Sequence, residues 1–259
     1  MRIALELLYN LTEAKRQFKL HEVRAVAGTW EGSQDTPYVF LSDDAEKLKA
    51  CYGNGGAEVA LLTEENRNQD FAFCRYAVMD TTAIDDEYVD MVYCRTKGIP
   101  LVIAESERLV LRELTPKDSD AILHLYEDGE ARKYLGVFYN SPDEIPKVID
   151  RYCKEVYGFY GYGIWGVYLR DTNKFIGLVG YTPREKGLEL GFAIDRDYRL
   201  QGYAKEAIEI SLDYARDYLG ESNIRACVSQ MNDRALKLLN YLGFIEINHS
   251  NIAELSLHF

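Results

Sequence analysis

Short apolar runs alternate with amphipathic runs through the first part of the chain. The apolar runs have the length of buried strands, and the amphipathic runs have the spacing of helices that cover one face of a sheet. The pattern predicts strands at 38–41, 58–62, 76–79 and 100–103 and helices at 43–52 and 85–96. Because strands separated by helices form parallel sheets, we expect a small open Rossmann-like α/β unit here.

The start of the chain and a glycine cluster carry weaker signals. Leu5, Leu8 and Leu11 have the spacing of a helix start, and residues 21–27 have the alternation of a strand. The cluster 53–56 follows a helix and fits neither GxGxxG nor GxxxxGKS/T, so we interpret it as a helix end and turn. No motif in residues 1–104 specifies a chemistry, which leaves a ligand-binding, partner-binding or stabilising role open for this part.

The pattern changes near Glu105. Beyond it we expect strands at 108–114, 164–170, 175–181, 188–194, 224–230, 245–247 and 254–258 and helices at 115–126, 141–156, 204–219 and 233–242. The order is one strand, two helices, three strands, then helix, strand, helix and two strands. We therefore expect two domains, 1–104 and 105–259, with an α/β fold in each.

The turn 199–204 joins the apolar strand 188–194 to the amphipathic helix 204–219. Gly202 and Ala204 are small, so a ligand can approach the backbone closely there. The amides at the start of the helix lack partners inside it, and they attract anions such as phosphate. Strand, glycine turn and helix also occur together for structural reasons, so this turn becomes informative only with its neighbours.

Composition limits the classes of partner. The chain has 259 residues, 47% of them hydrophobic, and a formal net charge of -12. This balance argues against binding to nucleic acid or anionic membrane and weakly favours a cationic acceptor such as an amine. The first residues lack a secretory signal pattern, and no run is long enough to span a bilayer. Five cysteines without a CxxC pair indicate reduced thiols, so we expect a cytoplasmic protein without a metal site.

Four segments of the second domain occur together, although each alone would be weak evidence. They are ERLVLREL at 107–114, Trp165 with Phe175-Ile176-Gly177, Glu189-Leu190-Gly191-Phe192 with Arg199-x-x-Gly202-x-Ala204, and Asn232 ahead of Leu242-Gly243-Phe244. In this order they resemble the GCN5-related N-acetyltransferase (GNAT) family over residues 106–259. The subgroup they resemble is the RimJ/RimL type, which acetylates the N-termini of ribosomal proteins. The resemblance implies a mixed-sheet acyltransferase domain.

The resemblance also implies acetyl-CoA as co-substrate and a set of residues that bind it. Its pyrophosphate would lie on the backbone of Arg199, Leu200, Gln201, Gly202, Tyr203 and Ala204. A bulge at Phe192, Ala193 and Ile194 would free amides for the pantetheine arm and the thioester. Asn232 either bonds the pantetheine amide or only caps the next helix. The Arg199 side chain either contacts phosphate or is a solvated surface group.

Glu189 is the predicted catalytic base, because it is a carboxylate in an otherwise apolar strand beside the expected thioester. The alternative is a solvent-facing carboxylate paired with a lysine or arginine. No acid for the departing thiolate is assigned, because Leu239 and Ala235 occupy the positions where relatives have tyrosine or serine. Tyr241 points to another side of that helix. We expect Cys227 to be a buried core thiol.

Aromatic segments are the predicted walls of the acceptor pocket. They are 134–139 and 157–165, with ordinary core packing as the alternative. The whole pattern predicts an N-acetyltransferase that moves acetyl from acetyl-CoA directly to a primary amine, such as a protein N-terminus, a polyamine or a small molecule. The competing hypothesis is a regulatory module that binds acyl-CoA without turnover. Assembly into a homodimer is left open.

Overall fold

The computed structural model describes residues 4–8, 23–26, 38–51, 57–135, 141–248 and 250–259. The chain divides into two compact units, Met1–Ile99 and Pro100–Phe259. The glycine cluster expected to form a turn at 53–56 lies outside the described residues.

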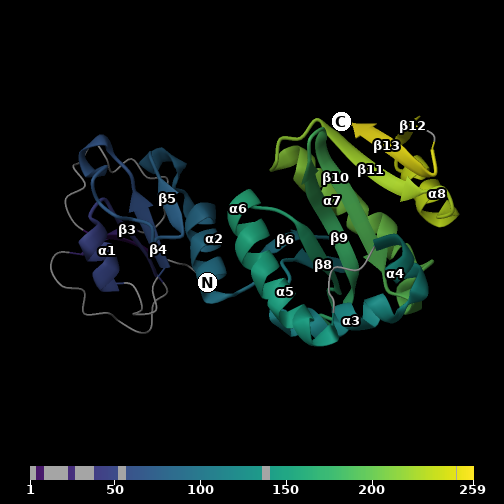
Figure 1. Cartoon of the computed structure of the whole chain (residues 1–259), viewed down its shortest axis with the longest axis horizontal. Coiled ribbons are helices and arrows are strands. Elements are labelled where there is room, and N and C mark those ends of the chain that lie inside the picture. Colours follow the sequence, from purple (N-terminus) through teal and green to yellow (C-terminus); the bar gives the residue numbers. More distant parts are fainter. Residues whose placement is uncertain (1–3, 9–22, 27–37, 52–56, 136–140, 249) are drawn as a thin grey trace. The chain divides into compact units, whose positions relative to one another are not determined.

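In its described residues, the first unit contains five parallel strands in the order β2-β1-β3-β4-β5 (Figure 1). The elements are β1 (Ala4–Leu8), β2 (Val23–Val26), β3 (Tyr38–Ser42), α1 (Ala45–Cys51), β4 (Ala57–Leu61), β5 (Tyr76–Val78) and α2 (Asp86–Lys97). Val39 on β3 packs in one apolar cluster with Val89 of α2, and Phe40 packs in another with Leu48 of α1. Successive residues of a strand face opposite sides, so the two helices cover opposite faces. The expected open parallel α/β unit is confirmed.

Two expectations for this part of the chain were wrong. The leucine spacing at the start suggested a helix, but β1 is a strand that pairs with both β2 and β3. A strand with parallel partners on both sides can be apolar on both faces, so short leucine spacings do not separate it from a helix. The strand expected at 100–103 exists as β6 (Val102–Glu105), but it does not join the parallel sheet of the first unit. It pairs antiparallel with β7 (Leu109–Arg112) in the second unit. β7 follows β6 closely in sequence, so this hairpin closes a much shorter loop than a pairing with the first sheet would.

The second unit contains eight strands in the order β12-β13-β11-β10-β9-β8-β7-β6 (Figure 1). Its further strands are β8 (Ile164–Leu169), β9 (Phe175–Arg184), β10 (Gly187–Ile194), β11 (Asn223–Ser229), β12 (Ile245–Asn248) and β13 (Ile252–His258). Neighbours pair antiparallel except β10 and β11, which are parallel. The predicted mixed sheet is therefore confirmed.

Helices cover both faces of this sheet. They are α3 (Ser119–Glu127), α4 (Gly129–Leu135), α5 (Ile145–Tyr152), α6 (Gly158–Tyr160), α7 (Tyr203–Asp217) and α8 (Asp233–Tyr241), and a π-helical turn, Cys153–Tyr157, joins α5 to α6. Ile208 of α7 and Leu239 of α8 belong to the main core cluster, together with Leu190 of β10. Ile122 of α3 belongs instead to a cluster with Leu178 of β9. The sheet is thus the middle of three layers.

Candidate functional site

The two parallel strands of the second sheet separate along their length. β10 and β11 pair only at Leu188 with Ile224 and at Glu189 with Arg225. The predicted bulge at 192–194 is not there, because β10 stays in unbroken register with β9 from Gly187 to Ile194. β11 instead keeps register with β13 over its whole length and so diverges from β10 as a unit. The two strands therefore leave a wedge-shaped gap between them, with strand backbone that has no ladder partner on that side. No extra residue in β10 is needed to open this wedge.

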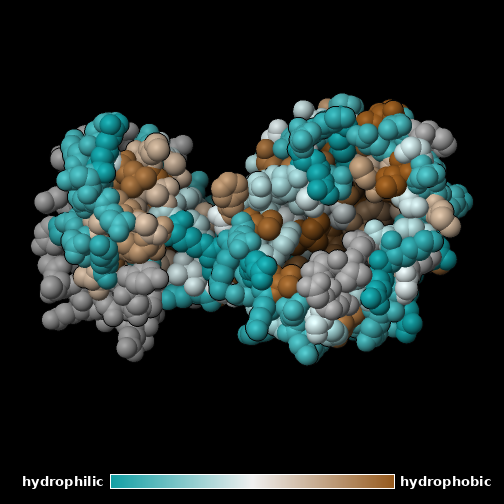
Figure 2. Space-filling view, in the orientation of Figure 1, coloured by the Kyte–Doolittle hydropathy of each residue, from teal (hydrophilic) through white to brown (hydrophobic). Residues whose placement is uncertain are grey.

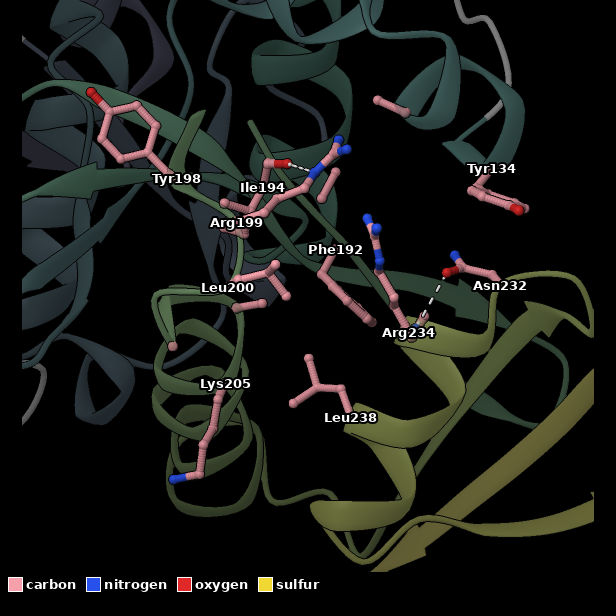
Figure 3. Close-up of a pocket in the computed structure, with 15 residues that line it drawn as sticks. Tyr134, Phe192, Ile194, Tyr198, Arg199, Leu200, Lys205, Asn232, Arg234 and Leu238 are labelled. Carbon is pink, nitrogen blue, oxygen red and sulfur yellow. Dashed lines mark hydrogen bonds between the residues drawn. The ribbon is translucent and has the colours of Figure 1, made fainter. Parts of the chain in front are cut away.

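A cavity of about 310 Å³ occupies this wedge (Figure 3). Figure 2 shows the corresponding hollow between α4 and α8, with hydrophobic residues at its floor. Its walls come from β10, the turn before α7, the start of α7, and helices α4 and α8. They are formed by Phe192, Ala193, Ile194, Tyr198, Arg199, Leu200, Gly202, Ala204, Lys205, Ala131, Tyr134, Asn232, Arg234, Ala235 and Leu238. The structure thus brings together most of the residues expected to bind the donor.

The turn before α7 has an unusual backbone. Leu200 and Gly202 have φ angles of 61° and 84°, in the left-handed region that favours glycine. Gly202 is the N-cap of α7, and the amide of Glu206 makes the bond to its carbonyl at 3.1 Å. The amides of residues 202–205 therefore precede the first helical bond and have no acceptor inside the helix. The positive end of the helix dipole adds to their attraction for an anion.

Arg199 has protein partners in the structure. Its Nε donates to the carbonyl of Ile194 at 2.9 Å, and its guanidinium forms an ion pair with Asp128. The side chain is 23% exposed, so it is not a solvated surface group. These contacts fasten the turn to the end of β10 and to the segment between α3 and α4. A contact of Arg199 with phosphate stays a prediction.

Gln201 and Tyr203 contribute backbone to the turn, while their side chains take other directions. Gln201 Nε2 donates to the carbonyl of Asp197 at 3.0 Å. The ring of Tyr203 lies under the guanidinium of Arg108, 4.5 Å from its central carbon. Neither residue is part of the cavity wall, so only their main-chain groups are candidates for contact with a ligand.

Asn232 caps α8 and also lines the cavity. Its Oδ1 accepts a hydrogen bond from the amide of Ala235 at 3.3 Å, which confirms the cap (Figure 3). The cap uses only the amide oxygen, so it does not compete with the other candidate role of Asn232. Contact of this side chain with a pantetheine amide therefore stays a prediction.

Glu189 lies in a second, smaller cavity of about 300 Å³ at the closed end of the wedge. Its Oε1 is 3.1 Å from the guanidinium of Arg184, and its side chain is 26% exposed. The pairing agrees with the alternative of a strand carboxylate held by an arginine. A role as base stays a prediction, and Arg184 would have to be displaced for Glu189 to fulfil it.

Cys227 lines the same small cavity, and the expectation that it is a buried core thiol was wrong. Its neighbours Ala226 and Val228 point into the core, so strand alternation places Cys227 on the exposed face. Burial of its sulfur, the hydrogen bond to Glu189 and the charges of Glu189 and Glu254 raise the pKa of this thiol to about 11. Cys227 is therefore protonated near neutral pH and is a poor nucleophile.

The two positions where relatives have a proton donor carry apolar residues here, and one of them, Ala235, lines the main cavity. Leu239 is fully buried and Ala235 is 9% exposed. Tyr241 is 74% exposed and lies outside the wall of the main cavity. Tyr134, expected as a wall of the acceptor pocket, lines the main cavity instead, and its hydroxyl donates to the carbonyl of Met231 at 3.2 Å.

Two cationic residues of the cavity were missed by the sequence analysis. Lys205 lies in the first turn of α7 and Arg234 in the first turn of α8. Cations at helix N-termini oppose the helix dipole, which favours carboxylates there. That unfavourable placement is a signal in the sequence, because an anionic ligand between the two helices would offset it.

The aromatic walls expected at 157–165 consist partly of core residues. Tyr157 and Trp165 are 1% and 0% exposed, and the Tyr157 hydroxyl donates to the carbonyl of Ile164 at 2.5 Å. Ordinary packing therefore explains these two residues. Phe159, in contrast, is 80% exposed. Residues 136–139 of the other expected wall lie outside the described residues.

Within residues 4–8, 23–26, 38–51, 57–135, 141–248 and 250–259, no group of three His, Cys, Asp or Glu side chains has the arrangement of a metal site. No helix in those ranges is both long and apolar enough to cross a bilayer. The polar and charged groups beside the wedge are therefore the candidates for the chemistry of the site.

The second unit is thus a mixed-sheet α/β domain whose cavity lies beside β10 and the first amides of α7. Residues 108–245, more than half of the chain, match the family of acetyltransferase (GNAT) domains. The chain belongs to this family, as the four sequence segments predicted. The match lies entirely within the second unit.

Individual relatives agree with this family. An uncharacterised N-acetyltransferase of Bacillus subtilis, YoaA, is 30% identical over 146 residues, which cover 55% of this chain and 82% of the relative. A Vibrio cholerae structure named as a candidate ribosomal-protein-serine acetyltransferase has a TM-score of 0.52 at 18% identity and covers 61% and 98% of the two chains. Mutant forms of a spermidine/spermine N-acetyltransferase from Vibrio cholerae have a TM-score of 0.51 at 20% identity, covering 59% and 95%. These structures share the fold.

Proposed function

We propose that the second unit transfers the acetyl group of acetyl-CoA directly to a primary amine. The observation that carries this proposal is the cavity beside the part of β10 that β11 has left, next to the first amides of α7, which have no acceptor inside the helix. Family membership supports the same donor. The spermidine/spermine N-acetyltransferase among the similar structures supports an amine acceptor. A protein N-terminus, a polyamine and a small amine are the acceptor classes to test.

The donor fits the cavity by charge and by shape. The amides of residues 202–205 would hold the pyrophosphate, with Lys205 and Arg234 as further cationic groups in the wall. The backbone of 192–194, from which β11 has diverged, would bond the pantetheine arm. Acetyl-CoA would supply the activated thioester, and the residues of this chain would bind and orient it.

The acceptor would approach from the closed end of the wedge, where Glu189 lies. Its ammonium group would replace Arg184 on the Glu189 carboxylate, which exchanges one cationic donor for another. Glu189, directly or through a water, would then take the proton that makes the amine nucleophilic. Water can return a proton to the departing thiolate, because a thiolate is a modest base.

A regulatory module that binds acyl-CoA without turnover is the second candidate. The observation that favours it is the burial of Leu239 and Ala235 at positions where relatives carry a proton donor. Such a module would keep the donor site and lose only the rate of transfer.

One experiment separates the two candidates. The full chain is given acetyl-CoA with butylamine, spermidine or a peptide with a free N-terminus, and CoA release and acetylated product are measured. We expect saturable transfer to at least one amine. Tight CoA binding by calorimetry without transfer to any of the three would favour the regulatory module, and no CoA binding would contradict both candidates.

We also propose a cytoplasmic setting and two functional domains near 1–104 and 105–259. Cys74, Cys94, Cys153 and Cys227 are not joined to one another by disulfides, which agrees with a reducing compartment. The division of the chain into compact units supports a separate first domain. Its own chemistry is not specified by any described cluster of side chains.

A further inference from the structure

Arg108 connects the first part of the second unit to the turn before α7. Its Nη1 donates to the carbonyl of Gln201 at 3.1 Å, across 93 positions of sequence. The face of its guanidinium covers the ring of Tyr203 at 4.5 Å, a cation–π contact. An ideal Cβ on Gly202 would lie 3.3 Å from Arg108 Nη2. The guanidinium therefore touches three consecutive residues of the turn.

Glu206 holds Arg108 in this position. The Arg108 Nε donates to Glu206 Oε2 at 2.7 Å, and the Arg108 amide donates to Oε1 at 3.2 Å. Ser106 Oγ donates to the same Oε1 at 2.7 Å. Burial alone would raise the pKa of Glu206, but the hydrogen bonds from Ser106 and Arg108 lower it overall. The carboxylate is thus kept ionised and fixes the guanidinium from two sides.

The turn needs such support because its own conformation is unfavourable. The left-handed conformation is unfavourable for a non-glycine residue such as Leu200, because its Cβ comes too close to a backbone carbonyl oxygen. The Leu200 side chain is 90% exposed, so its packing contributes little in return. Arg199 fastens the start of the turn to Ile194 and Asp128, and Arg108 fastens its end.

We propose that Arg108, held by Glu206, is a positioning residue that keeps turn 199–204 in the conformation that binds the CoA pyrophosphate. This inference rests on the proposed donor. Arg108 need not touch the ligand, because its contacts are with the carbonyl of Gln201 and the ring of Tyr203. Without it the turn spends less time in the binding conformation, and apparent affinity falls by that fraction.

The first test uses the full chain and compares substitutions of two arginines, each of which forms ion pairs with residues of α7. We call the Arg108–Glu206 pair, with its contacts to Gln201 and Tyr203, the clamp. Arg108→Gln removes the clamp, whereas Arg216→Gln removes ion pairs with Asp213 and Asp217 at the far end of the same helix. The two side chains are similarly exposed, at 44% and 47%. We expect the calorimetric Kd for CoA to rise about tenfold in Arg108→Gln and less than about twofold in Arg216→Gln.

Kinetic constants distinguish a positioning residue from one that only stabilises the fold. In Arg108→Gln the KM for acetyl-CoA should rise with the Kd, while kcat at saturating acetyl-CoA and the KM for the amine stay unchanged. Arg108→Lys should retain stability and lose affinity, because one ammonium cannot reproduce the planar fork between Glu206 and Gln201. Glu206→Gln provides a second variant if Arg108→Gln folds poorly, and its CoA affinity should fall in the same direction.

Hydrogen exchange of the ligand-free protein tests the clamp without any ligand. The Glu206 amide, which donates to the carbonyl of Gly202, should exchange faster in Arg108→Gln than in the wild type and in Arg216→Gln. If wild type binds CoA and both Arg108→Gln and Glu206→Gln bind it equally well, the clamp is refuted while the proposed donor stands. If the wild type does not bind CoA, the proposed function is refuted, and the clamp's assigned role with it.

Discussion

Glu189 and Arg184 form an ion pair beside the point where β10 and β11 separate. The guanidinium occupies the carboxylate oxygen, so the proposed catalysis requires an exchange of partners. Arg184 is 58% exposed and can turn into water without disturbing the core. A paired carboxylate on a strand is therefore compatible with a base that becomes available when the acceptor arrives.

Glu189→Gln is expected to lower kcat/KM for acetyl transfer by about 10²–10⁴, because the amide cannot accept the proton. The Kd for CoA should not change, since Glu189 is not part of the main cavity wall. Initial rates with acetyl-CoA and calorimetry with CoA measure the two quantities. Glu254→Gln, in the same small cavity, is the control. Equal losses in both variants would point to general electrostatics instead of a base.

Cys227 reports on Glu189 independently of turnover. The raised pKa of about 11 predicts slow alkylation by iodoacetamide at pH 8 despite the exposure of the residue. Glu189→Gln removes one cause of the raised pKa and should speed alkylation by at least about threefold. Peptide mass spectrometry measures the rate, with Cys94 of the first unit as internal control. A rate that Glu189→Gln leaves unchanged would mean that the two groups do not interact in solution.

At the scale of elements, the wedge arises because β11 pairs along its whole length with β13 and only briefly with β10. This strand follows β13 in register from Asn223 to Ser229 and leaves β10 after two pairs. β10 is fixed on its other side by a full ladder with β9. That ladder requires a close approach at Gly177, where an added Cβ would lie 2.2 Å from the carbonyl oxygen of Ala193.

Gly177→Ala should therefore destabilise the second unit by about 1–3 kcal/mol, since the backbone of β10 would have to move. Gly191→Ala is the matched control on β10, because its Cβ would meet only Ile164 Cδ1 at 3.5 Å, an ordinary contact. Urea unfolding followed by circular dichroism measures both. Equal midpoints for the two variants would refute the close approach.

At the scale of the whole molecule, the segment around β6 belongs to the second unit. The Glu113 amide donates to the carbonyl of Leu101 at 2.9 Å, and Glu113 Oε2 accepts from the Leu101 amide at 3.4 Å. Glu113 is 3% exposed, so removal of residues 100–105 would leave a buried carboxylate without this partner.

A chain of residues 100–259 should therefore be more stable than one of residues 106–259. We expect the shorter chain to unfold about 5 °C or more lower, because it lacks an edge strand and a partner of Glu113. The longer one should bind CoA within about twofold of the full chain, since the main cavity lies within the second unit. Calorimetry measures both quantities. Identical melting temperatures would mean that β6 does not stabilise the unit.

Much of the second unit was predictable because its signals are local. Alternation in 164–170, 175–181 and 188–194 predicted β8, β9 and β10, and the cap at Asn232 predicted the start of α8. The start of the chain was harder, since the leucine spacing of β1, a strand with parallel partners on both sides, fits a helix as well as a strand. Side-chain partners were not predictable in the site either, because Arg108 and Gln201 lie far apart in sequence.

The sequence by itself determined the family and the position of the turn at 199–204, because small residues, periodicity and caps act over a few neighbouring positions. Only the tertiary structure decided what the turn's arginine does, where Glu189 lies and how the wedge opens. Those outcomes depend on contacts between distant strands. Arg199 pairs with Asp128, Glu189 pairs with Arg184, and β11 follows β13 instead of β10. The turn is thus encoded locally, while the cavity beside it is a product of packing.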